Sequence, residues 1–170
     1  LQFKSWDKSE QLAFLINAYN AWTIEIVLSR YPNLESIRDI GLFPFSVWRK
    51  SVIKLFDNSY SLDDIEHELI RGSGIFEEPR IHFALNCAAI GCPALRPEAY
   101  VGRHLDQQLE DSTKLFLTDK SRNYFLDGGL YISSIFDWYG EDFEKGWLGI
   151  NSVCQFLSLY KRQLDVSSDT

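Results

Sequence analysis

The sequence predicts an α+β fold, a single mixed domain with a central buried N-terminal helix, further helices and small antiparallel β-hairpins. The first observation is a nearly all-apolar run from Leu12 to Leu28, which is typical of a helix buried on most sides. The second is a pair of segments, 51–61 and 123–133, each with turn residues in its middle, as in β-hairpins. The third is the order of the elements, because they do not alternate as in a doubly wound parallel sheet.

Length and charge limit the classes of protein and partner. The chain has 170 residues, 45% of them hydrophobic, and a formal net charge of -7. We therefore predict one globular domain over residues 1–165, followed by a frayed tail at 166–170. An acidic chain lacks the concentrated basic face that nucleic acid requires, so a small-molecule or peptide ligand is the expected partner. The chain begins at Leu1 and contains no methionine, so we expect that a further segment preceded it.

The first helix has a start signal and a stop signal. Asp7 and Glu10 form a variant of the capping box, and Tyr31-Pro32 ends the helical run. Asn17 and Asn20 are three residues apart and share one face, where each buried amide needs hydrogen-bond partners. The two asparagines therefore either cap neighbouring loops or line a polar pocket. Because polar residues interrupt this short run, we expect no membrane span within this chain.

The next elements are a short helix, a hairpin and a second capped helix. The pattern predicts a short helix over 34–40 and a β-hairpin over 51–61. Ser61 is the expected N-cap of the following helix, and Asp64 three places on completes a capping box. The residues of this helix that carry chemistry, and the glycine that ends it, are Glu66, His67, Arg71 and Gly72.

The stretch 80–96 places more reactive side chains among apolar residues than any other part of the chain. It contains His82, Asn86, two of the three cysteines and two arginines. A proline after two glutamates at its start, and Gly91 farther on, predict a helix between them. The alternation of apolar residues also fits a strand. In either case His82 and Asn86 face one side, and Cys87 faces another.

A helix, a hairpin and a last helix follow toward the C-terminus. Helices are predicted over 103–117 and 151–164, on either side of the hairpin at 123–133. The segment 134–143 is aromatic, acidic and irregular. The residues of the first of these helices that we expect to face the core are Leu105, Leu109, Leu115 and Phe116.

Five groups of residues occur in an order and spacing that are specific only when taken together. They are Phe14–Ala21, Ser61–His67, Pro79–Cys87, Cys92-Pro93 with Leu95-Arg96, and the aromatic and acidic residues of 134–143. Together they resemble the domain-of-unknown-function family numbered 547, over most of the chain. The family pattern has a serine and a second proline where this chain has Gly91 and Ala94. The resemblance implies a single globular unit and supplies no established reaction.

The first hypothesis for function is a thiol-dependent hydrolase or acyl transferase with Cys87 or Cys92 as its nucleophile. His82 or His67 would be the base, and Asn86 would orient that histidine, by analogy with Cys/His/Asn enzymes. Two observations oppose this hypothesis. On a helix, Cys87 would point about 140° away from His82. Cys92 would follow a helix C-terminus, where the dipole raises the pKa of a thiol.

Three alternatives remain open. A zinc site would use His67, His82, Cys87 and Cys92 as ligands, with Glu66 as general base. A non-catalytic peptide- or ligand-binding module would use an aromatic groove made by Phe43, Phe45, Trp48, Phe136, Trp138 and Tyr139. In a purely structural role, the histidine and cysteines would be core residues. Glu66 with Arg71, or Arg80 with Asp142, would then be structural ion pairs.

The predicted site gathers these candidates around the first helix. The catalytic candidates are Cys87, Cys92, His82, His67 and Asn86. The substrate-binding candidates are Asn17, Asn20, Glu66, Arg80, Arg96, Trp138, Tyr139 and Asp142. No metal and no cofactor is included in this prediction.

The three cysteines leave the compartment open. An odd number of cysteines does not form a complete disulfide framework. A Cys87–Cys92 disulfide with Cys154 buried would fit a periplasmic or secreted protein, and three thiols would fit the cytoplasm.

Overall fold

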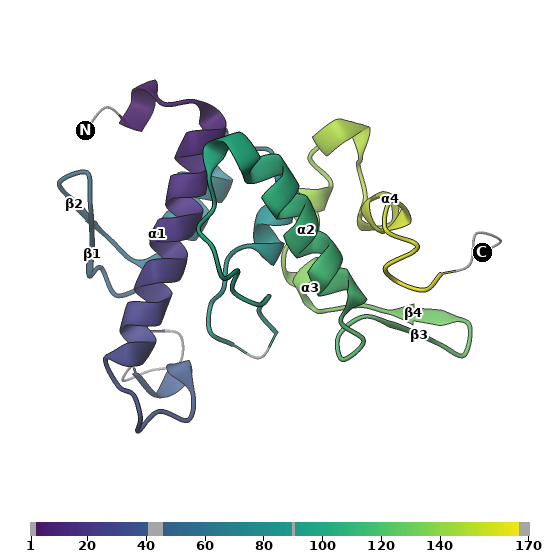
Figure 1. The fold of residues 1–170 in the computed structure, drawn as a ribbon, viewed down its shortest axis with the longest axis horizontal. Coiled ribbons are helices and arrows are strands. Elements are labelled where there is room, and N and C mark those ends of the chain that lie inside the picture. The colour runs from purple at the N-terminus through teal and green to yellow at the C-terminus, as the bar shows by residue number, and fades with distance from the viewer. Residues whose placement is uncertain (1–2, 41–45, 90, 167–170) are drawn as a thin grey trace.

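A computed structural model describes residues 3–40, 46–89 and 91–166 of the protein. It confirms the α+β class, with helices and two separate two-stranded antiparallel sheets (Figure 1). The α-helices are α1 (Lys8–Leu28), α2 (Leu105–Thr118), α3 (Ile135–Trp138) and α4 (Val153–Ser158). The sheets pair β1 (Ile53–Leu55) with β2 (Asn58–Tyr60), and β3 (Tyr124–Leu126) with β4 (Gly129–Tyr131). The two hairpins lie at opposite ends of the molecule (Figure 1).

Short helical segments connect these elements. A π-helix spans Asp64–Ile70. The 3-10 helices are Phe3–Ser5, Ile37–Ile40, Arg71–Ser73, Pro79–Phe83, Gly102–His104, Gly140–Phe143 and Trp147–Gly149. Helices of the 3-10 and π types are short because their backbone geometry is less favourable than that of the α-helix. No helix of the described residues is long and apolar enough to cross a membrane.

The hydrophobic core has two parts that meet at the segment following Glu78. The first part surrounds α1 and includes Ile81 and Leu85. The second part lies between α2, α3 and α4, and its phenylalanines include Phe83. Because neighbouring residues of one segment enter different parts of the core, this segment is fixed from both sides. Ring-to-ring packing in the second part accounts for some of the many aromatic residues of the chain. The rings that pack on one another are those of Phe83, Phe116, Phe136, Phe143 and Phe156.

Helix α1 matches the prediction in position and partly in burial. Its middle part, residues 11–20, is buried on most sides, whereas Lys8, Ser9 and Glu10 at its start and Ile24 and Leu28 near its C-terminus are exposed. The predicted capping box is not formed, because the Asp7 side chain makes no capping hydrogen bond. The Asp7 carbonyl instead accepts the first helical bond, from the Gln11 N–H at 2.9 Å.

The second capping box is formed as predicted. The Asp64 N–H donates to Ser61 Oγ at 3.0 Å, and the Ser61 N–H donates to Asp64 Oδ2 at 2.7 Å. The helix that follows is a π-helix rather than an α-helix, and it gives way to a 3-10 turn at Arg71. Gly72 is required in this turn, because a Cβ atom there would lie 2.6 Å from the His67 carbonyl oxygen.

Three local predictions differ from the structure. The helix predicted between positions 79 and 91 is only the 3-10 helix Pro79–Phe83, because side chains take over the backbone hydrogen bonds beyond it. Leu115 is 62% exposed, since it is turned about 120° away from the buried Leu109 on α2. The last helix ends at Ser158 and continues as turns. Residues 167–170 of the predicted tail lie outside the described residues.

Candidate functional site

A pocket of ≈ 450 Å³ lies between α1, the π-helix, the segment after His82 and the C-terminal end of α3. Its aromatic lining residues are Tyr19, Trp48, Trp138 and Tyr139. Its titratable or charged lining residues are Arg38, Arg49, Asp63, Glu66 and His67. Cys87 and Ala89 complete the lining. This pocket is the candidate site, because five of the predicted site residues, Glu66, His67, Cys87, Trp138 and Tyr139, line it together.

Glu66 lies at the inner end of this pocket. The residue is only 7% exposed, and its carboxylate lies close enough to the hydroxyl groups of Tyr19 and Tyr139 to influence the pKa of both. Burial raises the pKa of Tyr19 and that of Tyr139, and the neighbouring Glu66 charge raises both further. The two phenols therefore stay protonated and keep their O–H groups beside the carboxylate.

A chain of polar contacts supports the wall of the pocket. Arg71 Nη1 donates to His67 Nδ1 at 2.7 Å, and Arg71 Nε donates to Asp142 Oδ2 at 2.5 Å. Because the guanidinium is always a donor, His67 Nδ1 is an acceptor and the proton of the neutral ring lies on Nε2. His82 Nε2 also meets Asp142 Oδ2, at 2.8 Å, and Lys145 Nζ meets Oδ1 at 2.6 Å.

Asp142 is the centre of this chain. Although its burial opposes ionisation, hydrogen bonds from His82, Arg71 and Lys145 hold the pKa of Asp142 well below its usual range. Burial lowers the pKa of His82, against the opposing effect of Asp142, so the ring is neutral and donates from Nε2. The His82 ring stacks on Tyr139 with ring centroids 4.0 Å apart. Asp142 thus fixes His82, and His82 supports a wall of the pocket through Tyr139.

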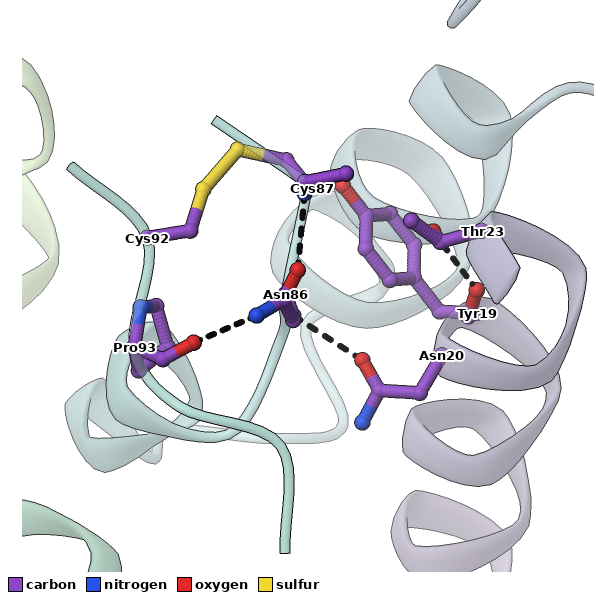
Figure 2. Close-up of a disulfide and its surroundings, with 8 residues drawn as sticks. Tyr19, Asn20, Thr23, Asn86, Cys87, Cys92 and Pro93 are labelled. Carbon is purple, nitrogen blue, oxygen red and sulfur yellow. Dashed lines mark hydrogen bonds between the residues drawn. A yellow bond between two sulfur atoms is a disulfide. The ribbon is translucent and has the colours of Figure 1, made fainter. Parts of the chain in front are cut away.

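A disulfide between Cys87 and Cys92 borders the pocket (Figure 2). Figure 2 shows the ring of Tyr19 beside Cys87, and both residues line the pocket. The side chain of Asn86 braces the ring that the disulfide closes. Its Nδ2 donates to the Pro93 carbonyl at 2.5 Å, and its Oδ1 accepts the Ala88 N–H at 2.7 Å. Cys154, the remaining cysteine, is exposed rather than buried.

The structure brings some of the predicted site residues together. Glu66, His67, Cys87, Trp138 and Tyr139 line the pocket, and His82 with Asp142 lies directly behind Tyr139. Asn17, Asn20 and Asn86 instead hold segments of backbone. Asn17 bonds to both backbone groups of Tyr100, as Asn20 does to the Ala84 carbonyl and the Asn86 N–H. Loop capping, one of the two roles predicted for Asn17 and Asn20, is thus confirmed.

Two arginines of the predicted site lie elsewhere. Arg80 is buried and binds the carboxylates of Glu78 and Asp106, both at 2.7 Å, and it lies over the ring of Trp147. Arg96 pairs with Glu98 and donates to the Gln108 carbonyl at 3.2 Å. We predicted an ion pair between Glu66 and Arg71, or between Arg80 and Asp142. Both pairings were wrong, because Arg71 pairs with Asp142.

The four residues of the zinc hypothesis are not assembled as ligands. The sulfur atoms of Cys87 and Cys92 are bonded to each other, and the two histidines bind Arg71 and Asp142. Within residues 3–40, 46–89 and 91–166, no group of three or more His, Cys, Asp or Glu side chains could hold a metal ion. Of the predicted aromatic groove, Phe43 and Phe45 lie outside the described residues and Phe136 is in the core, whereas Trp48 lines the pocket.

Sequence reasoning missed Tyr19, Arg38, Arg49 and Asp63 as pocket residues. Tyr19 lies in an apolar helical run, where an aromatic residue predicts only core packing. The signal that could have found it is its hydroxyl group, which must find a partner when it is buried. A larger hollow of ≈ 1020 Å³ lies beside α1 and the β1–β2 hairpin, and its described lining is mainly apolar and includes none of the predicted site residues.

The fold and the site define an α+β domain built on a central helix, with a buried carboxylate at the inner end of an aromatic pocket. The chain belongs to the family described as protein of unknown function, DUF547, whose model matches residues 3–117. The matched part includes α1, the π-helix and the disulfide, whereas Trp138, Tyr139 and Asp142 follow it. Comparisons with curated proteins and with solved structures found no match.

Proposed function

We propose that this domain is a ligand-binding module, and that the pocket around Glu66 is its binding site. The observation that supports this most strongly is the setting of Glu66. A buried carboxylate is normally paired with a cation. Glu66 takes part in no ion pair of the described residues, and the polar groups beside its carboxylate are two neutral phenols. A negative charge therefore faces the pocket and is available to a ligand that carries hydrogen-bond donors.

The size and lining of the pocket agree with this proposal. Sites for small molecules typically have volumes of roughly 300–1,000 Å³ and combine apolar or aromatic walls with a few polar groups. Here four aromatic side chains line the pocket beside five titratable or charged ones, and Glu66 is the buried member of the second group. Trp138 is 61% exposed at the pocket, so its indole ring can contact a ligand without being part of the core.

A screen of small neutral and charged fragments by saturation-transfer NMR tests this proposal. We expect fragments with hydrogen-bond donors to bind, and we expect Trp138→Ala and Glu66→Gln each to weaken them about tenfold, or about 1.4 kcal/mol. Tyr131→Ala removes an exposed aromatic ring of β4 at the far end of the molecule, and it is the matched control. Fragment binding that is equally strong in all three variants would place the ligand site elsewhere.

Thiol chemistry at Cys87 is the second candidate function, as a hydrolase or acyl transferase. The observation that favours it is that Cys87 and His67 line the same pocket, whereas the buried His82 is held by Asp142. The disulfide would first have to be reduced to release the Cys87 thiol. Glu66 and Asp63 line this pocket too, and nearby negative charge disfavours a thiolate. We therefore rank this function below ligand binding.

Alkylation of the reduced protein separates the two candidates. Cys154 is exposed and serves as an internal reference for an ordinary thiol. If the domain only binds a ligand, Cys87 should react with iodoacetamide no faster than Cys154 at pH 7, as measured by mass spectrometry of the peptides. A thiol enzyme would instead show Cys87 reacting at least tenfold faster than Cys154, and His67→Ala would remove that difference.

A further inference from the structure

The charges around the pocket follow an order from its inner end to its mouth. Glu66 is buried at the inner end, beside the hydroxyl groups of Tyr19 and Tyr139. Arg38 and Arg49 are exposed lining residues, and the Arg49 side chain is 77% exposed. A ligand that enters this pocket thus meets two arginines at the mouth, one of them paired with Asp63, and a carboxylate at the inner end.

The inner end suits an ammonium group. A cation is attracted both by a carboxylate and by the faces of aromatic rings, and each attraction strengthens when water is excluded. The rings of Tyr19 and Tyr139 line the pocket together with Glu66, and the exposed Trp138 lines it nearer to solvent. Arg71 does not take this place, because its guanidinium is bound to Asp142 and His67.

The mouth suits an anionic group. Arg49 pairs with Asp63 only at 3.4 Å and with a highly exposed side chain, and such surface pairs contribute roughly 0–1 kcal/mol. A ligand carboxylate can therefore replace or share this contact at little cost. Arginine is also well suited to this role, because its planar guanidinium matches a carboxylate in two parallel hydrogen bonds.

We infer that the pocket selects zwitterionic ligands of the amino-acid class, with the ammonium group against Glu66 and the carboxylate against Arg38 and Arg49. This inference rests on the proposed ligand-binding function and adds the class and the orientation of the ligand. A ligand with both charges matches the two ends of the pocket. A ligand with one charge contacts the oppositely charged group at one end only and gains nothing at the other end.

Three probes of equal chain length test this inference. They are 4-aminobutyrate, which has both charges, n-butylammonium, which has the positive charge only, and butyrate, which has the negative charge only. We expect 4-aminobutyrate to bind at least tenfold more tightly than n-butylammonium in NMR titrations at low salt, with butyrate the weakest. Glu66→Gln should weaken the two amines about tenfold and leave butyrate unchanged. The double variant Arg38→Gln/Arg49→Gln should remove the advantage of 4-aminobutyrate over n-butylammonium.

A control variant outside the pocket is included, and the possible results distinguish failure of the inferred ligand class from failure of the proposed function. Arg162→Gln removes an exposed arginine outside the pocket and should change none of the three affinities. If n-butylammonium binds as tightly as 4-aminobutyrate, or if the amines fail while neutral fragments still bind in a Trp138-dependent way, the inferred ligand class is wrong and the proposed function stands. If neither the three probes nor the fragments bind, both the inference and the proposed function fail.

Discussion

Replacing Asp142 by leucine is expected to lower the free energy of unfolding by about 3–5 kcal/mol, as is typical when one partner of a buried ion pair is removed. Asp142 is buried and accepts hydrogen bonds from Arg71, His82 and Lys145. Leucine has a similar volume, so packing is largely kept while the partly buried Arg71 guanidinium loses its carboxylate. Urea unfolding, followed by tryptophan fluorescence, measures the change.

Two further variants separate the contacts of Asp142. Lys145→Ala removes the donor whose side chain is the most exposed of the three, and it should lower the free energy of unfolding by no more than about 1 kcal/mol. Asp142→Asn keeps the shape and part of the hydrogen bonding, so its effect should lie between those of the other two. Equal effects for Asp142→Leu and Lys145→Ala would mean that the contacts of Arg71 and His82 do not stabilise the fold.

The same cluster makes the stability fall on acidification. The pKa of Asp142 is lowered in the folded state, so its contribution is complete above the pKa of an unfolded carboxyl, about 4, and is lost as the pH falls below it. The pKa of His82 is also lowered, by burial, so protonation favours the unfolded chain as the pH falls below about 6.5. Both effects have the same sign. In Asp142→Leu, the loss of stability below about pH 4 should be smaller than in the unmodified protein.

The features that could be predicted from the sequence are those whose partners are close along the chain. Ser61 and Asp64 are three residues apart, and the capping box is formed as predicted. Both hairpins also lie where their turn residues indicate. The Arg71–Asp142 pair, by contrast, joins residues 71 positions apart, and no local pattern indicates which carboxylate an arginine will reach.

The segment after Phe83 shows why a helix signal can fail. Proline at its start and a run of alanines and apolar residues favour a helix, but propensity is a weak prior that tertiary contacts override. Here the Asn20 side chain donates to the Ala84 carbonyl and accepts the Asn86 N–H. The Asn86 side chain accepts the Ala88 N–H. The backbone groups that a helix would have paired with one another are thus satisfied by side chains. As a result Cys87 lines the pocket, whereas His82 is held behind it.

Asn20 is therefore the residue through which α1 fixes this segment. Its Nδ2 donates to the Ala84 carbonyl at 2.9 Å, and its Oδ1 accepts the Asn86 N–H at 2.9 Å. Figure 2 shows the Asn20 side chain pointing from α1 toward the backbone segment that carries Asn86 and Cys87. Asn17 makes the equivalent pair of bonds to Tyr100 one turn earlier, at a less buried position.

Asn20→Leu is expected to lower the free energy of unfolding by about 3–4 kcal/mol. The substitution leaves one buried carbonyl and one N–H without their partner, and each such group costs about 1–3 kcal/mol. Asn20→Asp keeps the acceptor for the Asn86 N–H and loses only the donor, although it adds a buried charge. Asn17→Leu is the matched comparison, and it should have a smaller effect because Asn17 is less buried than Asn20. If urea unfolding gave Asn20→Leu the smaller effect of the two, the segment before Cys87 would be held by its own core contacts rather than by α1.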